Sequence, residues 1–148
     1  MATKKQALGE WGELRVAGTC VCPRCKRSKT LKRLRANFKC ADLICDFCGF
    51  LAQVKTATVP DVACPPRTVL GAAWKPQQER MAAAIYFPLF LVLKSGRDVA
   101  IYYLSTDFQS EALFRPRTPL GAEAKRAGWQ GFLYCLDALP EGALVRLA

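Results

Sequence analysis

The sequence predicts a single mixed α/β domain, and three observations support this fold class. At 148 residues the chain is one domain long and can bury a hydrophobic core. Hydrophobic residues make up 51% of it, which favours folding over disorder. Segments with helical periodicity alternate with short apolar runs typical of strands, and we find no internal repeat, low-complexity tract or linker.

The first half predicts one helix and one β-hairpin. Leu8, Trp11 and Leu14 fall on one face of an amphipathic helix expected over residues 5–18. A basic segment with several cysteines follows. Two runs with strand character then flank a short turn at residues 45–49, which predicts a hairpin. The expected strands are residues 38–44 and 50–56.

The second half predicts a loop, a helix and three strands. Pro60, Pro65 and Pro66 indicate a loop over residues 59–70. A tight turn at residues 94–97 separates two apolar runs, which predicts a second hairpin. The remaining expected elements are a helix over residues 72–84 and strands over residues 85–93, 98–104 and 132–136.

Charge and composition point to a polyanionic partner and exclude several enzyme classes. The formal net charge is +10, and nine basic residues but no acidic one lie between Glu13 and Asp42. Such a block favours DNA through counterion release, although a solvated basic face is the alternative. The chain has no histidine, which excludes histidine-dependent nucleases, His-ligated zinc hydrolases and Ser-His-Asp chemistry.

The chain shows no sign of membrane insertion or secretion. Its N-terminus lacks the apolar stretch of a secretory signal. The longest apolar run, residues 81–93, is too short to span a bilayer and contains Pro88. We therefore expect a cytoplasmic protein, in which cysteines serve more often as metal ligands than as disulfides.

Four cysteines have the spacing of a structural zinc site. Two C-x2-C pairs are separated by nineteen residues, and each pair suits one edge of a tetrahedron of thiolates. The expected ligands are Cys22, Cys25, Cys45 and Cys48, within a zinc-binding insertion over about residues 20–48. Four incidental buried cysteines are the alternative. The other cysteines, at positions 20, 40, 64 and 135, are expected to pack as small apolar residues.

A second constellation suggests phosphodiester hydrolysis. Gln53 and Lys55 are two residues apart on a predicted strand, so they point to the same face. Asp42 lies on the paired strand, and a turn at residues 45–48 would set it opposite Leu51 or a near neighbour, diagonal to Gln53. Asp42, the Gln53 amide and a backbone carbonyl, that of Val54, would offer oxygen ligands to Mg2+.

In this arrangement Lys55 would orient the attacking water or stabilise developing negative charge. Alone, the pattern D-x10-Q-x-K is weak, because such a triplet also arises by chance and a strand lysine is usually just solvated.

The cysteine and strand motifs resemble a known family. CPRC, followed by ADLICDFCGFLAQVK and then by the block PLGAEAKRAGWQG, is similar to the catalytic domain of DpnI-like restriction endonucleases, over roughly residues 9–140. The resemblance implies a PD-(D/E)XK nuclease fold: a mixed central sheet flanked by helices, with an embedded four-cysteine zinc site. It also implies a DNA substrate and catalytic Mg2+, for which Mn2+ would substitute.

The resemblance also implies roles for individual residues. The metal-binding aspartate falls on Asp42, the catalytic lysine on Lys55 and an acidic residue of the first helix on Glu13. Arg126 and Trp129 take the place of DNA-contacting residues, a core tryptophan being the alternative for Trp129. The full set of expected DNA contacts is Arg24, Lys26, Arg27, Lys125, Arg126 and Trp129.

Two departures from the family pattern bear on activity. Gln53 replaces the second acidic residue, which keeps an oxygen ligand but removes a negative charge. The chain also ends before the winged-helix domain that reads methylated DNA in such enzymes, so we expect no such domain.

We therefore expect a Mg2+-dependent endonuclease acting on double-stranded DNA, of restriction type and with methylation-directed cleavage as an open question. A zinc-stapled DNA-binding protein without catalysis and a nuclease specific for DNA structure are the alternatives. Cleavage of both strands takes two nicks or transient pairing of two chains, and the sequence leaves the oligomeric state open.

Overall fold

The computed structural model describes residues 3–35, 38 and 41–148. These residues form two compact units. The first unit comprises Met1–Pro65, Phe87–Ser105 and Leu144–Ala148, and the second comprises Pro66–Tyr86 and Thr106–Ala143. Among the described residues, no helix is both long and apolar enough to cross a membrane.

A mixed six-stranded sheet forms the centre of the first unit. Its strand order is β1-β2-β3-β5-β6-β9, and only the β3–β5 pair is parallel. The predicted mixed α/β class with a mixed central sheet is therefore confirmed. The strands are β1 Leu31–Arg33, β2 Leu43–Cys45, β3 Leu51–Thr58, β5 Leu89–Ser95, β6 Asp98–Leu104 and β9 Leu144–Arg146.

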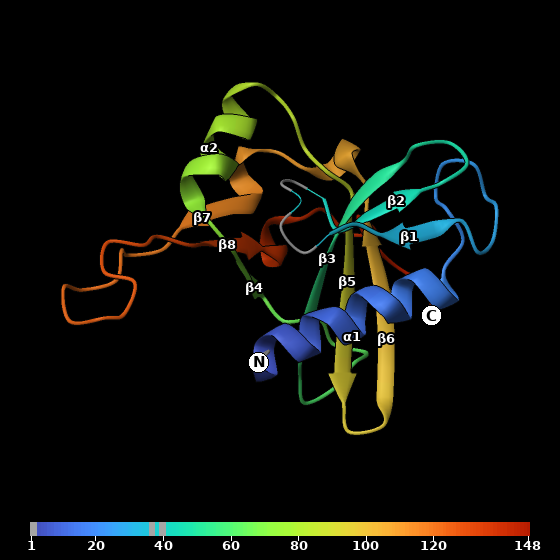
Figure 1. Cartoon of the computed structure of the whole chain (residues 1–148), viewed down its shortest axis with the longest axis horizontal. Helices are drawn as coiled ribbons and strands as arrows, with labels where there is room; N and C mark the ends of the chain where they lie inside the picture. The colour runs from blue at the N-terminus through green and yellow to red at the C-terminus, as the bar shows by residue number, and fades with distance from the viewer. Residues whose placement is uncertain (1–2, 36–37, 39–40) are drawn as a thin grey trace. The chain divides into compact units, whose positions relative to one another are not determined.

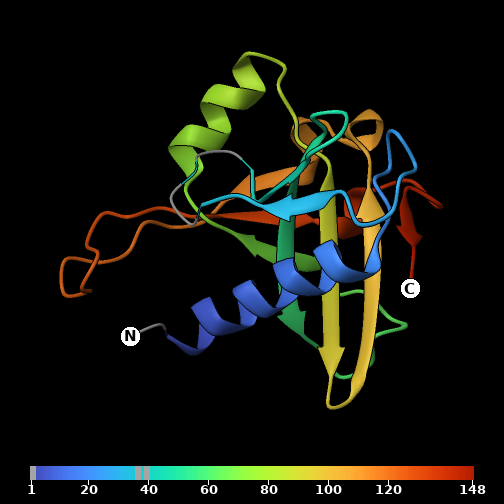
Figure 2. The same cartoon turned by 45° about the vertical axis from the view of Figure 1, so that its right-hand side comes forward.

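Helix α1, Lys4–Thr19, packs against β3 and β1 and lies in front of the sheet in both views (Figures 1 and 2). Its N-terminus is closed by a capping box, in which Thr3 and Gln6 satisfy each other's backbone N–H groups. Gly12 is buried against Thr56 of β3. The missing side chain at Gly12 therefore lets the helix approach the strand closely.

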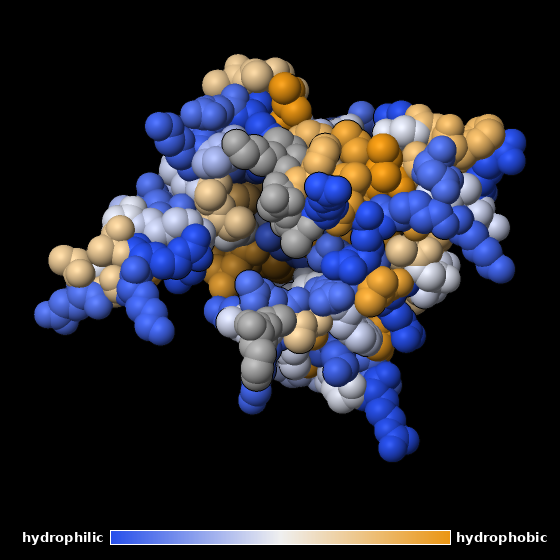
Figure 3. All heavy atoms as spheres, in the orientation of Figure 1, coloured by the Kyte–Doolittle hydropathy of each residue, from blue (hydrophilic) through white to orange (hydrophobic). Residues whose placement is uncertain are grey.

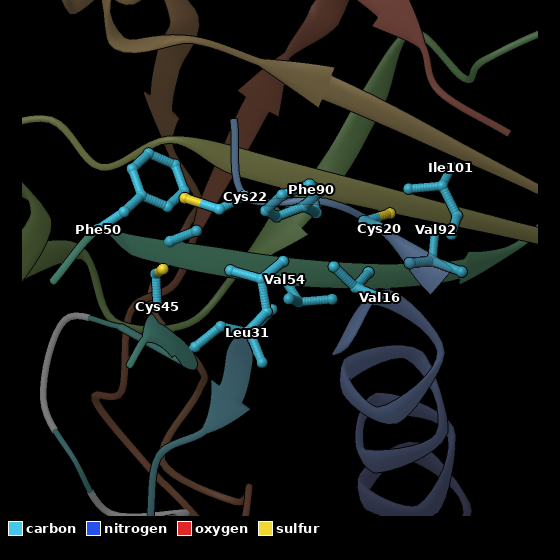
Figure 4. Close-up of a cluster of buried hydrophobic side chains, with 12 residues drawn as sticks. Val16, Cys20, Cys22, Leu31, Cys45, Phe50, Val54, Phe90, Val92 and Ile101 are labelled. Atoms are coloured by element: carbon cyan, nitrogen blue, oxygen red, sulfur yellow. The ribbon is translucent and has the colours of Figure 1, made fainter. Parts of the chain in front are cut away.

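The core of the first unit extends from the sheet into the cysteine segment. Leu43, Phe90 and Val92 are fully buried, and Val16 packs among them from α1 (Figure 4). Cys22 and Cys45 belong to the same buried cluster. The cysteine segment is thus tied to the sheet that carries Gln53 and Lys55.

The second unit is built on a smaller antiparallel sheet with the order β4-β8-β7. Phe114, Phe132 and Tyr134 form its aromatic centre, with ring centroids 5.1–5.8 Å apart. Its elements are β4 Thr68–Gly71, helix α2 Trp74–Ala82, β7 Phe114–Pro116, β8 Phe132–Cys135 and short 3-10 helices at Thr106–Phe108, Glu111–Leu113 and Leu136–Ala138.

Several predicted boundaries were wrong. The strand expected over residues 38–44 is confined, in the described part of the chain, to Leu43–Cys45; residues 39 and 40 lie outside that part. The loop expected over residues 59–70 ends in β4, and the strand expected from residue 85 begins at Leu89, after Pro88. The short strands β1, β7 and β9 were not predicted.

Candidate functional site

Four cysteine sulfurs converge beside the hairpin of β2 and β3. The Sγ atoms of Cys22, Cys25, Cys45 and Cys48 all lie within 4.8 Å of one another. The closest pairs are Cys22 with Cys48 at 3.6 Å and Cys25 with Cys45 at 3.7 Å. Tetrahedral zinc with Zn–S bonds of about 2.3 Å needs sulfurs about 3.8 Å apart. The four cysteines are therefore positioned to hold a metal ion, and their chemistry suits zinc.

Backbone hydrogen bonds shape the two cysteine turns. The Lys26 N–H donates to the carbonyl of Cys22 at 2.9 Å, and the Gly49 N–H donates to the carbonyl of Cys45 at 2.9 Å. The turns are joined where Asp46 N–H donates to the Thr30 carbonyl at 2.8 Å. Backbone contacts thus hold the two turns together and gather the four sulfurs, which favours a structural site with no open coordination position.

The surroundings of the sulfurs shift two thiol pKa values in opposite directions. Burial raises the pKa of Cys22 to about 12. Burial also acts to raise the pKa of Cys45, but its hydrogen bond with the Thr30 hydroxyl and that from the Cys48 backbone N–H outweigh burial and lower that pKa to about 6. Zinc would bind the cysteines as thiolates, so its binding would release protons.

The other described cysteines lie outside this cluster. Cys20 and Cys135 are buried, as expected, and burial raises the pKa of Cys20. Cys64 is exposed, so its expected packing in a core was wrong. It lies in the proline-rich loop, where its Sγ is 3.6 Å from Asp61 Oδ2. Cys40 lies outside the described residues.

Asp42 is fixed against strand β3 by two hydrogen bonds. Its N–H donates to the Ala52 carbonyl at 2.9 Å, and its Oδ2 accepts from the Val54 N–H at 2.8 Å. The ladder pairs Leu43 with Ala52, so Asp42 is aligned with Gln53 rather than with Leu51. The expected proximity to β3 is confirmed, and the expected register was wrong by two residues.

Gln53 and Lys55 alternate along β3 with the buried residues Ala52 and Val54. Both are partly buried and share one face of the strand, as their spacing predicted. The Asp42 carboxylate is hydrogen-bonded to the backbone of Val54, the residue that lies between Gln53 and Lys55. An amide and an ammonium group therefore flank the point on β3 where the carboxylate is held.

Glu13 of α1 interacts electrostatically with this group of residues. Burial raises the pKa of Glu13 above its ordinary value, and the negative charge of Asp42 raises it further, while Arg33 lowers it. Arg33 Nε lies 3.7 Å from Glu13 Oε1, and the Glu13 side chain is only 18% exposed. The negative charge of Asp42 thus acts on Glu13, and carboxylates are the ligands that hard cations prefer.

The expected DNA contacts fall into two groups, one in each unit. Arg24, Lys26 and Arg27 are exposed on the first cysteine turn. In the second unit Lys125 and Arg126 are exposed, and Trp129 is partly buried with the Arg126 guanidinium 4.5 Å from its ring centroid. Trp129 is therefore not the fully buried core residue of the alternative interpretation.

Three contributors to the site were not predicted from the sequence. Arg33 bridges Glu13 and Glu10, Gly12 seats α1 on β3, and exposed Phe47 stacks with Arg27. Each depends on a contact between segments far apart in the chain. Only the exposed aromatic within the Cys45–Cys48 turn carried a sequence signal, because turn residues are usually polar.

Comparison with known proteins gives the family. No curated protein matches the chain. The protein-family model described as DpnI: Dam-replacing family matches residues 3–148, which is essentially the whole chain. This match, with the four-cysteine cluster and the mixed sheet, agrees with the resemblance read from the motifs and indicates a restriction-type nuclease role with DNA as substrate. The chain belongs to the DpnI Dam-replacing family.

Proposed function

We propose that the protein is a metal-dependent DNA endonuclease whose reaction takes place where Asp42, Gln53, Lys55 and Glu13 meet. The observation that carries the proposal is the hydrogen bond from the Val54 N–H to Asp42 Oδ2 at 2.8 Å. It fixes a carboxylate directly beside the Gln53-x-Lys55 segment, which is the local arrangement that phosphodiester hydrolysis by a hard cation requires.

The proposed mechanism divides the work among these residues. The Asp42 carboxylate, the Gln53 amide oxygen and the Val54 carbonyl would hold Mg2+ or Mn2+, and Glu13 would add a second carboxylate. A cation held there would supply a water of lowered pKa and would offset charge on the phosphate. Lys55 hydrogen-bonds the attacking water and stabilises the negative charge that develops on the phosphate. The first cysteine turn presents Arg24, Lys26 and Arg27 for contacts to DNA phosphates. In the second unit, the DNA contacts are Lys125, Arg126 and Trp129.

The first experiment measures plasmid cleavage with Mg2+ or Mn2+ by the wild-type protein and by Lys55→Ala. We expect Lys55→Ala to lose about 10²–10³-fold in rate, as when one charge-stabilising donor is removed, and to keep DNA binding. Lys94→Ala is the matched control, because Lys94 is a partly buried lysine on the adjacent strand β5. Cutting by neither protein under conditions of full DNA binding contradicts the proposal.

Gln53 favours a second candidate function, a DNA-binding protein without catalysis. The neutral Gln53 side chain lacks the negative charge of a carboxylate, which weakens the attraction of the site for a divalent cation. Gln53→Glu separates the two candidates. If the site is active, this variant should reach half-maximal rate at roughly ten-fold lower Mg2+, the effect of about 1.4 kcal/mol. If neither the wild-type protein nor Gln53→Glu cleaves, the binding function takes precedence.

The same assay tests substrate choice. Adenine-methylated and unmethylated copies of one plasmid are compared, together with branched and single-stranded DNA. A difference between the two plasmids extends the proposal to methylation-directed restriction. Faster cutting of branched or single-stranded DNA than of either plasmid favours a structure-specific nuclease instead.

A further inference from the structure

The second cysteine turn exposes an aromatic ring that no packing argument explains. Phe47 lies between Cys45 and Cys48, and 60% of it is accessible to solvent. The Arg27 guanidinium carbon lies 3.8 Å from the centroid of its ring, which is the distance of face-to-face stacking. Arg27 comes from the first cysteine turn, so the cluster that gathers the cysteines also gathers this stack.

Two neighbouring lysines occupy backbone positions that disfavour any side chain. Lys26 has φ of +63° and Lys29 has φ of +59°. Glycine is the residue that adopts this left-handed region without strain, and other residues lose stability there. A basic side chain at each of these positions thus costs stability, which is understandable if the positive charges are used for binding.

The surroundings of the stack are basic and solvent-exposed. Arg24 lies over Phe50 at 5.5 Å, and Lys32 is exposed with its Nζ 4.0 Å from Asp46. Hydrophilic and apolar side chains lie next to each other on the face that Figure 3 shows. An exposed ring beside a guanidinium and lysines is the combination by which proteins bind unstacked bases together with their phosphates.

We propose that Phe47 and Arg27 form a DNA contact in which the ring stacks on an unpaired base and the guanidinium holds an adjacent phosphate, with Lys26 and Lys29 adding phosphate contacts. This inference rests on the proposal that DNA is the substrate and adds a substrate class to it. The two cysteine turns should therefore bind DNA with a gap, a flap or another unstacked base more tightly than continuous duplex.

The test measures binding rather than cleavage. Zinc-loaded protein, without Mg2+ and without chelator, is titrated against a short duplex and against the same duplex with a gap that contains 2-aminopurine. Fluorescence anisotropy gives the Kd, and quenching of 2-aminopurine reports stacking. The variants are Phe47→Leu, which keeps an apolar side chain without a ring, and Phe108→Leu as control, since Phe108 is an aromatic residue of similar exposure (46%).

We expect Phe47→Leu to weaken binding of the gapped probe about ten-fold or more, in line with base–aromatic stacking of ~1–3 kcal/mol, and to abolish the quenching. Binding of continuous duplex should change less than about two-fold, and Phe108→Leu should match the wild type. Equal affinities of Phe47→Leu and wild type for the gapped probe overturn the inference, and so do equal losses on both probes.

Lys26→Gly keeps the inference testable if Phe47→Leu loses zinc. This change relieves the backbone at a left-handed position, so it should raise or preserve the melting temperature. Affinity should nevertheless fall, and the slope of log K against log salt should decrease by about 0.7–0.9, the loss of one phosphate contact. Unchanged affinity and slope overturn the inference. Because no cleavage is measured, a failed nuclease test and a failed stacking test are distinguishable.

Discussion

At the scale of single residues, the candidate site depends on how one carboxylate is held. Asp42 accepts a hydrogen bond from the backbone of the strand that carries Gln53 and Lys55, so its position does not depend on a flexible partner. Glu13 differs, because burial and the charge of Asp42 both oppose its ionisation. Interacting carboxyl groups without a bound cation destabilise the fold, and this cost is understandable if the two groups bind a cation as proposed.

Glu13→Gln should therefore stabilise the zinc-loaded protein at neutral pH when no Mg2+ is present. Folding raises the pKa of Glu13, so the folded state binds this proton more tightly than the unfolded state does. The resulting penalty is absent below the unfolded pKa, grows as pH rises towards the folded pKa and is complete above it. We expect the melting temperature of Glu13→Gln to exceed that of the wild type at pH 7 and to match it near pH 3.

Cleavage by Glu13→Gln should show the opposite trend. If Glu13 holds the cation as a carboxylate, the variant should need more Mg2+ for half-maximal rate although it is more stable. A variant that is less stable than the wild type at pH 7 would show that the ion pair with Arg33 outweighs the burial of Glu13.

At the scale of elements, the hairpin of β2 and β3 contributes to both sites. Its turn carries two of the four cysteines, and its strands hold Asp42 against β3. A bound zinc ion would stabilise the turn by on the order of 10 kcal/mol, which is comparable with the whole folding free energy of a domain. The four-cysteine cluster and the proposed hydrolytic site are thus linked through one short element.

Loss of a zinc ligand should consequently unfold the region that holds Asp42. We expect Cys48→Ser to contain no zinc by metal analysis and to lose its cooperative thermal transition near the wild-type temperature. Cys64→Ser is the control, because Cys64 is exposed and lies outside the cluster. A Cys48→Ser protein with wild-type zinc content and melting temperature would refute a structural zinc site.

Helix α1 sets the position of Glu13 through its contact with β3. A Cβ atom at Gly12 would collide with the side chain of Thr56 and lie 3.0 Å from Thr56 Cβ. Gly12→Ala should therefore push the helix away from the strand and cost about 1–3 kcal/mol by overpacking. Gly9→Ala in the same helix meets open space, so it should stabilise the protein by roughly 0.5–1 kcal/mol.

Thr56→Ala should rescue Gly12→Ala. This change removes Thr56 Oγ1 and Cγ2, two of the three atoms that an added Cβ at Gly12 would meet. No hydrogen bond is lost with them, because Thr56 Oγ1 has no partner in the described part of the chain. Denaturant unfolding of the two single variants and the double variant forms a double-mutant cycle. Additive losses in that cycle would show that Gly12 and Thr56 are not in contact in solution.

The sequence predicted those elements whose signal is local. The first helix, the β2–β3 hairpin and the strands β5 and β6 have clear periodicity or turn residues, and the cysteine spacing predicted the cluster. Strands β1, β7 and β9 have three residues each, too few to establish a period. The alignment of Asp42 with Gln53 and the close contact of Gly12 with Thr56 depend on tertiary contacts, which no single segment encodes.

At the scale of the whole molecule, the chain crosses between the two compact units four times, after Pro65, Tyr86, Ser105 and Ala143. The first unit consists of three separate stretches and the second of two. Unfolding of either unit would leave the ends of the other joined by a long flexible loop, at an entropic cost. Neither unit is therefore expected to persist when the other unfolds.

This connectivity predicts one cooperative unfolding transition, which the tryptophans can report separately. Trp11 lies in the first unit, and Trp74 and Trp129 lie in the second. Fluorescence of Trp74→Phe/Trp129→Phe follows the first unit alone, and fluorescence of Trp11→Phe follows the second. In zinc-loaded protein each variant should give a fluorescence transition that coincides with its own circular dichroism transition, the standard test of two-state behaviour.

Removal of zinc should then shift both reporters together, although the cysteine cluster lies entirely in the first unit. A chelator titration that lowers the midpoint of the Trp11 signal and leaves that of Trp74 and Trp129 unchanged would show two independently stable units. In that case the proposed DNA contacts of the second unit, at Arg126 and Trp129, would survive loss of zinc. Under the single-transition prediction they are lost with it, and DNA binding falls at the same chelator concentration as both fluorescence signals.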